Sequence, residues 1–174
     1  MATSSKSQAF AAIKANGSVV TWGGFGGDSS AVAARLTEGV VQVRGTQDAF
    51  AAIKANGSVV TWGGFGGGNS SAVAPLLTED VLQVCGNDRA FAAIKANGSV
   101  ANRSVVTWGD AADGGDSSAV ASCLTEGVVQ VCGNAGAFAA IKANGSVVTW
   151  GKAARGGDSS AVAALLTEGV VQDC

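Results

Sequence analysis

Residues 9–23 read Ala-Phe-Ala-Ala-Ile-Lys-Ala-Asn-Gly-Ser-Val-Val-Thr-Trp-Gly, and this stretch decides the fold because the chain repeats it. The copies begin at Ala9, Ala49, Ala90 and Ala137, and a Thr-Trp-Gly segment follows in each. Self-similarity at this spacing is typical of units that stack to share a core. We expect one repeat domain over residues 1–174, with units at about 9–48, 49–89, 90–136 and 137–174.

The Asn-Gly pair between two apolar runs predicts a β-hairpin in every unit. A two-residue turn centred on Asn16 and Gly17 would pair Phe10 with Gly23 and would place Phe10 and Trp22 on opposite faces of the hairpin. Both faces would be largely apolar, so both must be covered by neighbours. A propeller blade or a sheet inside a stack meets that requirement.

Two further elements are expected in each unit. Asp28 and Ser29 precede an alanine-rich run that ends at Gly39, which predicts a helix of two to three turns. The run Val40–Val43 predicts a third strand, and its last copy, Val170–Gln172, is predicted to complete the first hairpin. The fold class is therefore mainly β with short helices, arranged as propeller-like blades or as an open β-repeat array.

Composition excludes several classes of protein. The chain is 47% hydrophobic and 14% charged, which is typical of a folded domain. No apolar run approaches the roughly 20 residues of a membrane span, so association with a membrane is expected only through a partner. The 11 basic residues are scattered and the net charge is −2, so no nucleic-acid partner is expected. Residues 1–8 lack the apolar core of a secretion signal, and the compartment stays open between cytoplasm and an organelle.

Catalytic chemistry is not expected from this sequence. The chain has no histidine, and its acidic residues recur as equivalent columns instead of one unique cluster. We predict no enzyme activity, no catalytic residue, no cofactor and no metal. The four cysteines, Cys85, Cys123, Cys132 and Cys174, form no Cys-x-x-Cys pair, and buried thiols, a disulfide or a metal site stay open as interpretations.

The run Val-Val-Gln-Val-x-Gly followed by the Asn-Gly-Ser-Val-Val-Thr-Trp-Gly segment resembles the repeat of the regulator of chromosome condensation family. That resemblance covers nearly the whole chain and implies protein-binding β-propeller blades. The units here are shorter and fewer than in that family and lack its histidine and its Gly-Gln-Leu-Gly segment. The Gly-Asp-Ser-Ser-Ala-Val variant resembles repeats of dinoflagellate algal proteins. No exchange-factor residue is carried over to this chain.

The loops that vary between units are the expected contact sites. They hold Phe25, Phe65, Asp110, Asp113, Lys152 and Arg155. A large aromatic residue in a glycine-rich turn is typical of an anchor, and loop residues carry function more often than core residues do. Two functions are consistent with these features. One is a non-catalytic scaffold or protein-binding module; the other is an accessory structural subunit of a large assembly, such as an algal photosynthetic membrane complex.

Overall fold

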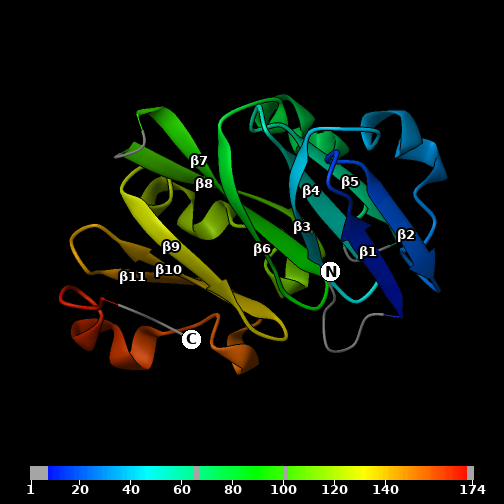
Figure 1. Cartoon of the computed structure of the whole chain (residues 1–174). Helices are drawn as coiled ribbons and strands as arrows, with labels where there is room; N and C mark the ends of the chain where they lie inside the picture. The colour runs from blue at the N-terminus through cyan, green and yellow to red at the C-terminus, as the bar shows by residue number, and fades with distance from the viewer. Residues whose placement is uncertain (1–7, 65–66, 100–101, 172–174) are drawn as a thin grey trace.

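The computed structural model describes residues 8–64, 67–99 and 102–171, and it contains four small antiparallel sheets that follow one another along the chain (Figure 1). The first sheet pairs β1 (Ala9–Ile13) with β2 (Val19–Gly23). The other three have three strands each: β3 (Val40–Gly45), β4 (Ala49–Lys54) and β5 (Val59–Gly63); β6 (Val81–Gly86), β7 (Ala90–Ser99) and β8 (Asn102–Gly109); β9 (Val128–Gly133), β10 (Ala137–Lys142) and β11 (Val147–Gly151). The predicted mainly β repeat fold is confirmed, in the form of an open array.

Short 3₁₀ helices connect the sheets. They are η1 (Ser30–Arg35), η2 (Ser71–Leu77), η3 (Ala111–Asp113), η4 (Ser118–Cys123), η5 (Ala153–Arg155) and η6 (Ser160–Leu165). None of the helices in the described part of the chain is long and apolar enough to cross a membrane.

The hairpin prediction was right about the turn sequence but wrong about the register. The Gly17 amide donates to the Lys14 carbonyl over 2.9 Å, and the Lys14 amide donates to the Ser18 carbonyl over 2.8 Å. The loop therefore has three residues, with only Gly17 at positive φ (75°), while the Asn16 side chain accepts from the Ser18 amide. This is a type I turn closed by a glycine bulge, and it shifts the pairing by one residue.

The shifted register puts both aromatic rings on one face. Phe10 lies opposite Trp22, not opposite Gly23 as predicted, and the two rings stack with centroids 5.4 Å apart. The same pairing recurs in the other units, at Phe50 with Trp62, Phe91 with Trp108 and Phe138 with Trp150. Each unit thus has a ring face, made of the Phe and Trp side chains, and an opposite alanine face.

Neighbouring units pack ring face against alanine face. In one cluster Phe50 and Trp62 of the second unit lie against Ala9 and Ala11 of the first, with Leu36 at the edge. The same arrangement joins the second unit to the third and the third to the fourth. Both faces of the inner sheets are covered, as their apolar sequence predicted.

The predicted helices are present, but as 3₁₀ turns and not as α-helices. In η1 the Val32 amide donates to the Ser29 carbonyl, three residues back. Isolated helices much shorter than about 12 residues are marginal, so tertiary contacts decide the form of a six-residue segment. Here Leu36 is buried in the core and its carbonyl accepts from the Val19 amide. A lysine of the first hairpin strand contributes in two units, since Lys142 Nζ donates to the Cys123 carbonyl over 2.9 Å and Lys95 Nζ donates to the Leu76 carbonyl over 2.5 Å.

The Val40–Val43 strand is confirmed, whereas the expected closing strand is not observed. Val170 and Val171 lie outside any strand, and Gln172 lies outside the described residues. Within the described residues, β1 and β2 form a sheet of two strands. The cysteines differ in state: Cys123 is an exposed thiol, Cys85 Sγ donates to the Val131 carbonyl over 2.8 Å, and Cys132 is disulfide-bonded.

Asp80 offers a test of the turn that follows each 3₁₀ helix. It occupies the place of Gly39 and has φ of 63°, a left-handed conformation that costs a residue with a Cβ about 1–2 kcal/mol. Glycine also loses about 0.5–1 kcal/mol of chain entropy on folding. We expect Asp80→Gly to raise the free energy of unfolding by about 0.5 kcal/mol. The converse change, Gly127→Asp, should lower the free energy of unfolding, and urea unfolding measures both changes. A less stable Asp80→Gly variant would show that Asp80 is not strained.

The tryptophans provide a second test, of the contact between units. Trp62 is 4% exposed and its Nε1 donates to the Gly26 carbonyl of the preceding unit, whereas Trp22 is 44% exposed. Trp62→Phe should cost about 1–3 kcal/mol because a buried carbonyl loses its donor. Trp22→Phe, the matched control, should change the free energy of unfolding by less than about 0.5 kcal/mol. Equal losses in the two variants would show that the hydrogen bond does not matter.

Candidate functional site

The threonine of each Thr-Trp-Gly segment fixes the glycine-rich loop that follows. Thr21 Oγ1 donates to the Gly27 carbonyl over 2.6 Å and lies 2.9 Å from the Ser29 hydroxyl. The Asp28 carboxylate then accepts from the Ser30 amide over 2.8 Å. The threonine–serine contact recurs at Thr61 and Ser70, Thr107 and Ser117, and Thr149 and Ser159. A rigid frame therefore presents a loop of variable sequence in every unit.

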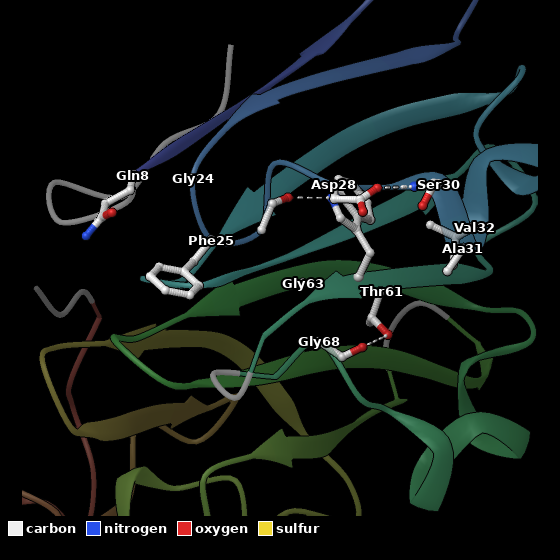
Figure 2. Close-up of a pocket in the computed structure, with 12 residues that line it drawn as sticks. Gln8, Gly24, Phe25, Asp28, Ser30, Ala31, Val32, Thr61, Gly63 and Gly68 are labelled. Atoms are coloured by element: carbon white, nitrogen blue, oxygen red, sulfur yellow. Dashed lines mark hydrogen bonds between the residues drawn. The ribbon is translucent and has the colours of Figure 1, made fainter.

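A groove of about 720 Å³ lies where the loop of the first unit meets the second unit. Its walls come from the loop after β2, from η1, from β5 and from the loop after β5, including Thr61 and Trp62. Figure 2 shows Gln8 and Phe25 on one side of the groove and Asp28, Ser30 and Val32 on the other.

Phe25 is the most unusual residue of this groove. Its side chain is 67% exposed, although the two neighbouring rings of its own unit, Phe10 and Trp22, are less exposed. The next residue, Gly26, is held in place because its carbonyl accepts from Trp62 Nε1 over 3.0 Å. A Cβ on Gly26 would lie 3.3 Å from the Phe50 ring and 2.9 Å from the Asp48 carbonyl oxygen, so the loop passes very close to the second unit. Phe25 thus extends from an anchored loop into solvent.

An equivalent groove of about 480 Å³ lies between the second and third units. It is bordered by Val73 and Leu76 on one side and by Trp108 and Asp116 on the other. The aromatic residue expected there, Phe65, lies outside the described residues. The groove is therefore a product of the stacking and recurs along the array.

Four other predicted contact residues lie in the equivalent loops of the last two units. Three of them lie around Gly136. A Cβ built on Gly136 would lie 3.0 Å from Asp113 Oδ1, 3.4 Å from Arg155 Cγ and 3.5 Å from Lys152 Cβ. Asp110 caps η3, because its carboxylate accepts from the Ala112 amide over 2.9 Å. The structure thus brings three of the predicted residues together and leaves Phe25 in a separate junction.

Two asparagines hold these polar loops, a role that the sequence analysis missed. Asn134 Nδ2 donates to the Arg155 carbonyl over 2.7 Å while its Oδ1 accepts from the Ala137 amide. Asn87 bonds the Asp113 carbonyl in the same way. The sequence does carry a sign of this role: an asparagine follows Cys-Gly at two equivalent positions of the repeat, and the earlier copy has Thr46 at that position.

The groove walls were also missed as site residues. Asp28 was interpreted only as a cap, and Thr61 and Trp62 only as strand residues. They gather because η1 of one unit packs on β5 of the next, a contact that no single repeat encodes. The hydrogen bond from the Ser30 amide, and then that from the Ser30 side chain, lower the pKa of Asp28, so this exposed carboxylate stays ionised at neutral pH.

Comparisons with known proteins support the fold. Neither the protein-family models nor the curated proteins include a match to this chain. The solved structures similar to it include human WBSCR16 (TM-score 0.54, 16% identity), Prp20p from Saccharomyces cerevisiae (0.55, 14%) and the CRINKLY WD40 ectodomain of the Arabidopsis thaliana receptor kinase ACR4 (0.52, 13%). The matches cover 83%, 83% and 87% of this chain and 45%, 42% and 54% of those chains.

This chain therefore spans about half the length of the solved structures it matches. Prp20p is a homologue of the regulator of chromosome condensation, so the resemblance seen in the repeat is confirmed at the level of a β-propeller-type repeat fold. The likeness to dinoflagellate proteins stays a prediction.

The capping carboxylates provide a pH test of the loop frame. The pKa of each of Asp28, Asp116 and Asp158 is lowered by hydrogen bonds from the serine two residues further along the chain. The bond from the backbone amide of that serine has the larger effect, and the bond from its side chain has the smaller. Their stabilising effect should be complete above the unfolded-state pKa and should disappear as the pH falls through the lowered folded-state pKa. NMR titration of the carboxyl carbons should give midpoints below those of ordinary aspartates.

The second unit supplies the control, since Asn69 accepts from the Ser71 amide over 2.9 Å without titrating. Asp116→Asn should keep the turn and remove that site's contribution to acid sensitivity. Ordinary midpoints at all three aspartates would show that the bonds do not persist in solution.

Proposed function

We propose that this chain is a non-catalytic protein-binding module and that a protein partner docks in the groove beside Phe25. The observation that carries the proposal is the 67% exposure of Phe25 on a loop whose backbone is fixed by Trp62. An aromatic side chain held in water by a rigid loop is a typical interface anchor, because its burial is favourable and little conformational freedom remains to be lost.

The chemistry of the groove indicates what the partner presents. Phe25, Val32 and the glycine backbone offer apolar surface, while the ionised Asp28 carboxylate lies on the opposite wall. An apolar side chain next to a basic or amide donor would satisfy both walls at once. Among the solved structures similar in fold, Prp20p is described by its binding to Gsp1p and histones, which supports protein binding as the general role.

Repetition of the polar residues supports the absence of catalysis. The aspartates that cap the turns make the same bond in the first, third and fourth units, and an asparagine makes it in the second. Catalysis requires a set of residues that differs from its copies, with a nucleophile or a base positioned by a neighbour. The differences between units lie instead in loops that suit recognition.

The test is affinity capture from native extract, quantified by mass spectrometry, with wild-type chain and two variants. Phe25→Ser should retain the melting temperature and should lower recovery of the specific partner at least tenfold, as loss of an anchor residue does. Val41→Ser, which removes a side chain that is 61% exposed on β3, is the control and should capture normally. Equal recovery by the wild type and Phe25→Ser would refute the groove as the docking site.

A further inference from the structure

The groove beside Phe25 has a single charge on its walls. Of the described residues that line it, Asp28 alone is charged, and the rest are glycine, small aliphatic, aromatic or uncharged polar residues. Asp28 is exposed, and the hydrogen bonds from Ser30, that of the amide before that of the side chain, lower its pKa. The carboxylate is therefore ionised at neutral pH, and it gives the groove a negative charge.

The Asp28 carboxylate is oriented by the chain but is not neutralised by it. Its Oδ1 accepts from the Ser30 amide over 2.8 Å, and a serine carries no charge. Within the part of the chain that the structure describes, neither a lysine nor an arginine pairs with Asp28. A carboxylate has about four acceptor sites, so capacity remains after the bonds from Ser30. The groove thus holds a fixed anion without a counter-charge.

Phe25 supplies an aromatic face on the other side of the groove. Figure 2 shows its ring across the groove from Asp28 and Ser30. The loop that carries the ring is anchored, since the Gly26 carbonyl accepts from Trp62 Nε1 over 3.0 Å. The face of an aromatic ring attracts a cation that lies within about 6 Å of its centre. Two features that each favour a cation therefore line one groove.

The rest of the lining offers apolar contact. Val32 is partly buried against the core cluster that includes Leu36, so its position is fixed. Ala31 and the backbone of Gly24 extend this apolar surface. Such a surface suits methylene groups and offers no partner to a second charge. The groove accordingly fits a long side chain with an apolar stem and a positive end.

On the basis of the proposed docking of a protein partner in this groove, we propose that the side chain entering it is an arginine of that partner. The guanidinium pairs with the Asp28 carboxylate and stacks on the Phe25 ring, while the methylene groups lie against Val32. Arginine fits better than lysine because its planar guanidinium forms two parallel bonds to a carboxylate and stacks on a ring. The ammonium group of lysine is a compact and strongly hydrated charge.

The second unit carries a natural control for this site. In the groove between the second and third units, Asn69 stands in the place of Asp28, and the carboxylate of that groove, Asp116, belongs to the later unit. Asn69 nevertheless accepts from the Ser71 amide over 2.9 Å, as Asp28 does from the Ser30 amide. An asparagine at this position therefore keeps the turn and removes only the charge.

The first test uses the full chain, labelled with ¹⁵N, and two small probes with blocked ends. One probe is acetyl-arginine amide, and the other is acetyl-citrulline amide, which has nearly the same shape but no charge. The arginine probe at up to about 20 mM should shift the NMR signals of the amides of residues 24–32 and of Trp62 Nε1–H, since one side chain supplies only millimolar affinity. The citrulline probe should bind about fivefold more weakly or less.

Three variants identify the groups that bind the probe. Asp28→Asn should retain the melting temperature and bind the arginine probe about fivefold more weakly than the wild type, and Phe25→Ser should bind it more weakly too. Asp158→Asn is the matched control, because Asp158 accepts from the Ser160 amide over 2.9 Å in the fourth unit, and it should bind like the wild type. Raising NaCl from about 0.05 M to about 0.5 M should weaken binding to the wild type and barely change Asp28→Asn.

Three outcomes of this titration would overturn the arginine site. They are equal affinity for the two probes, an affinity for the arginine probe that Asp28→Asn leaves unchanged, and signals of the groove that do not shift with either probe.

Affinity capture separates this inference from the docking function on which it rests. Asp28→Asn should recover about fivefold less of the partner than the wild type, and Asp158→Asn should recover the same amount. Loss of the partner in Phe25→Ser but not in Asp28→Asn would leave the docking function intact and show that no arginine enters the groove. Undiminished recovery by both Phe25→Ser and Asp28→Asn would refute the docking function itself.

Discussion

The stability of this molecule depends on the contact between one unit's aromatic pair and the glycine-rich loop of the unit before it. A single hairpin has two apolar faces and is marginal in water, so it can fold only when both faces are covered. The stacked Phe50 and Trp62 rings supply the apolar area, and the Trp62 bond to Gly26 fixes the distance between units. Glycine is required in that loop because a Cβ at Gly67 would lie 2.5 Å from the Phe91 ring.

The register of the hairpin is the local condition for this contact. A glycine bulge at Gly17 aligns Phe10 with Trp22, and a two-residue turn would have sent these rings to opposite sides of the sheet. With the rings on one face, the other face is left with alanine and aliphatic residues. The units therefore stack in one direction only.

The same construction separates stability from recognition. Threonine and serine hydroxyls hold the base of each loop, so the tip can change from Gly-Phe-Gly to Asp-Ala-Ala-Asp or Lys-Ala-Ala-Arg without disturbing the core. Grooves form where the 3₁₀ helix of one unit meets the outer strand of the next. The groove that we propose for binding is thus a by-product of stacking, and its rim includes a loop tip that varies between units.

The repeat, the strands and the positions of the variable loops were predictable from the sequence, because apolar alternation and Asn-Gly turns are local signals. Phe25 was identified as a site residue since it interrupts a run of glycines. The pairing of Phe10 with Trp22 was not predictable in the same way. Both a two-residue and a three-residue turn accept an Asn-Gly sequence, and the packing of the sheet decides which of the two forms. The walls at Asp28 and Trp62 also required the tertiary structure, since they belong to different units and meet only after stacking.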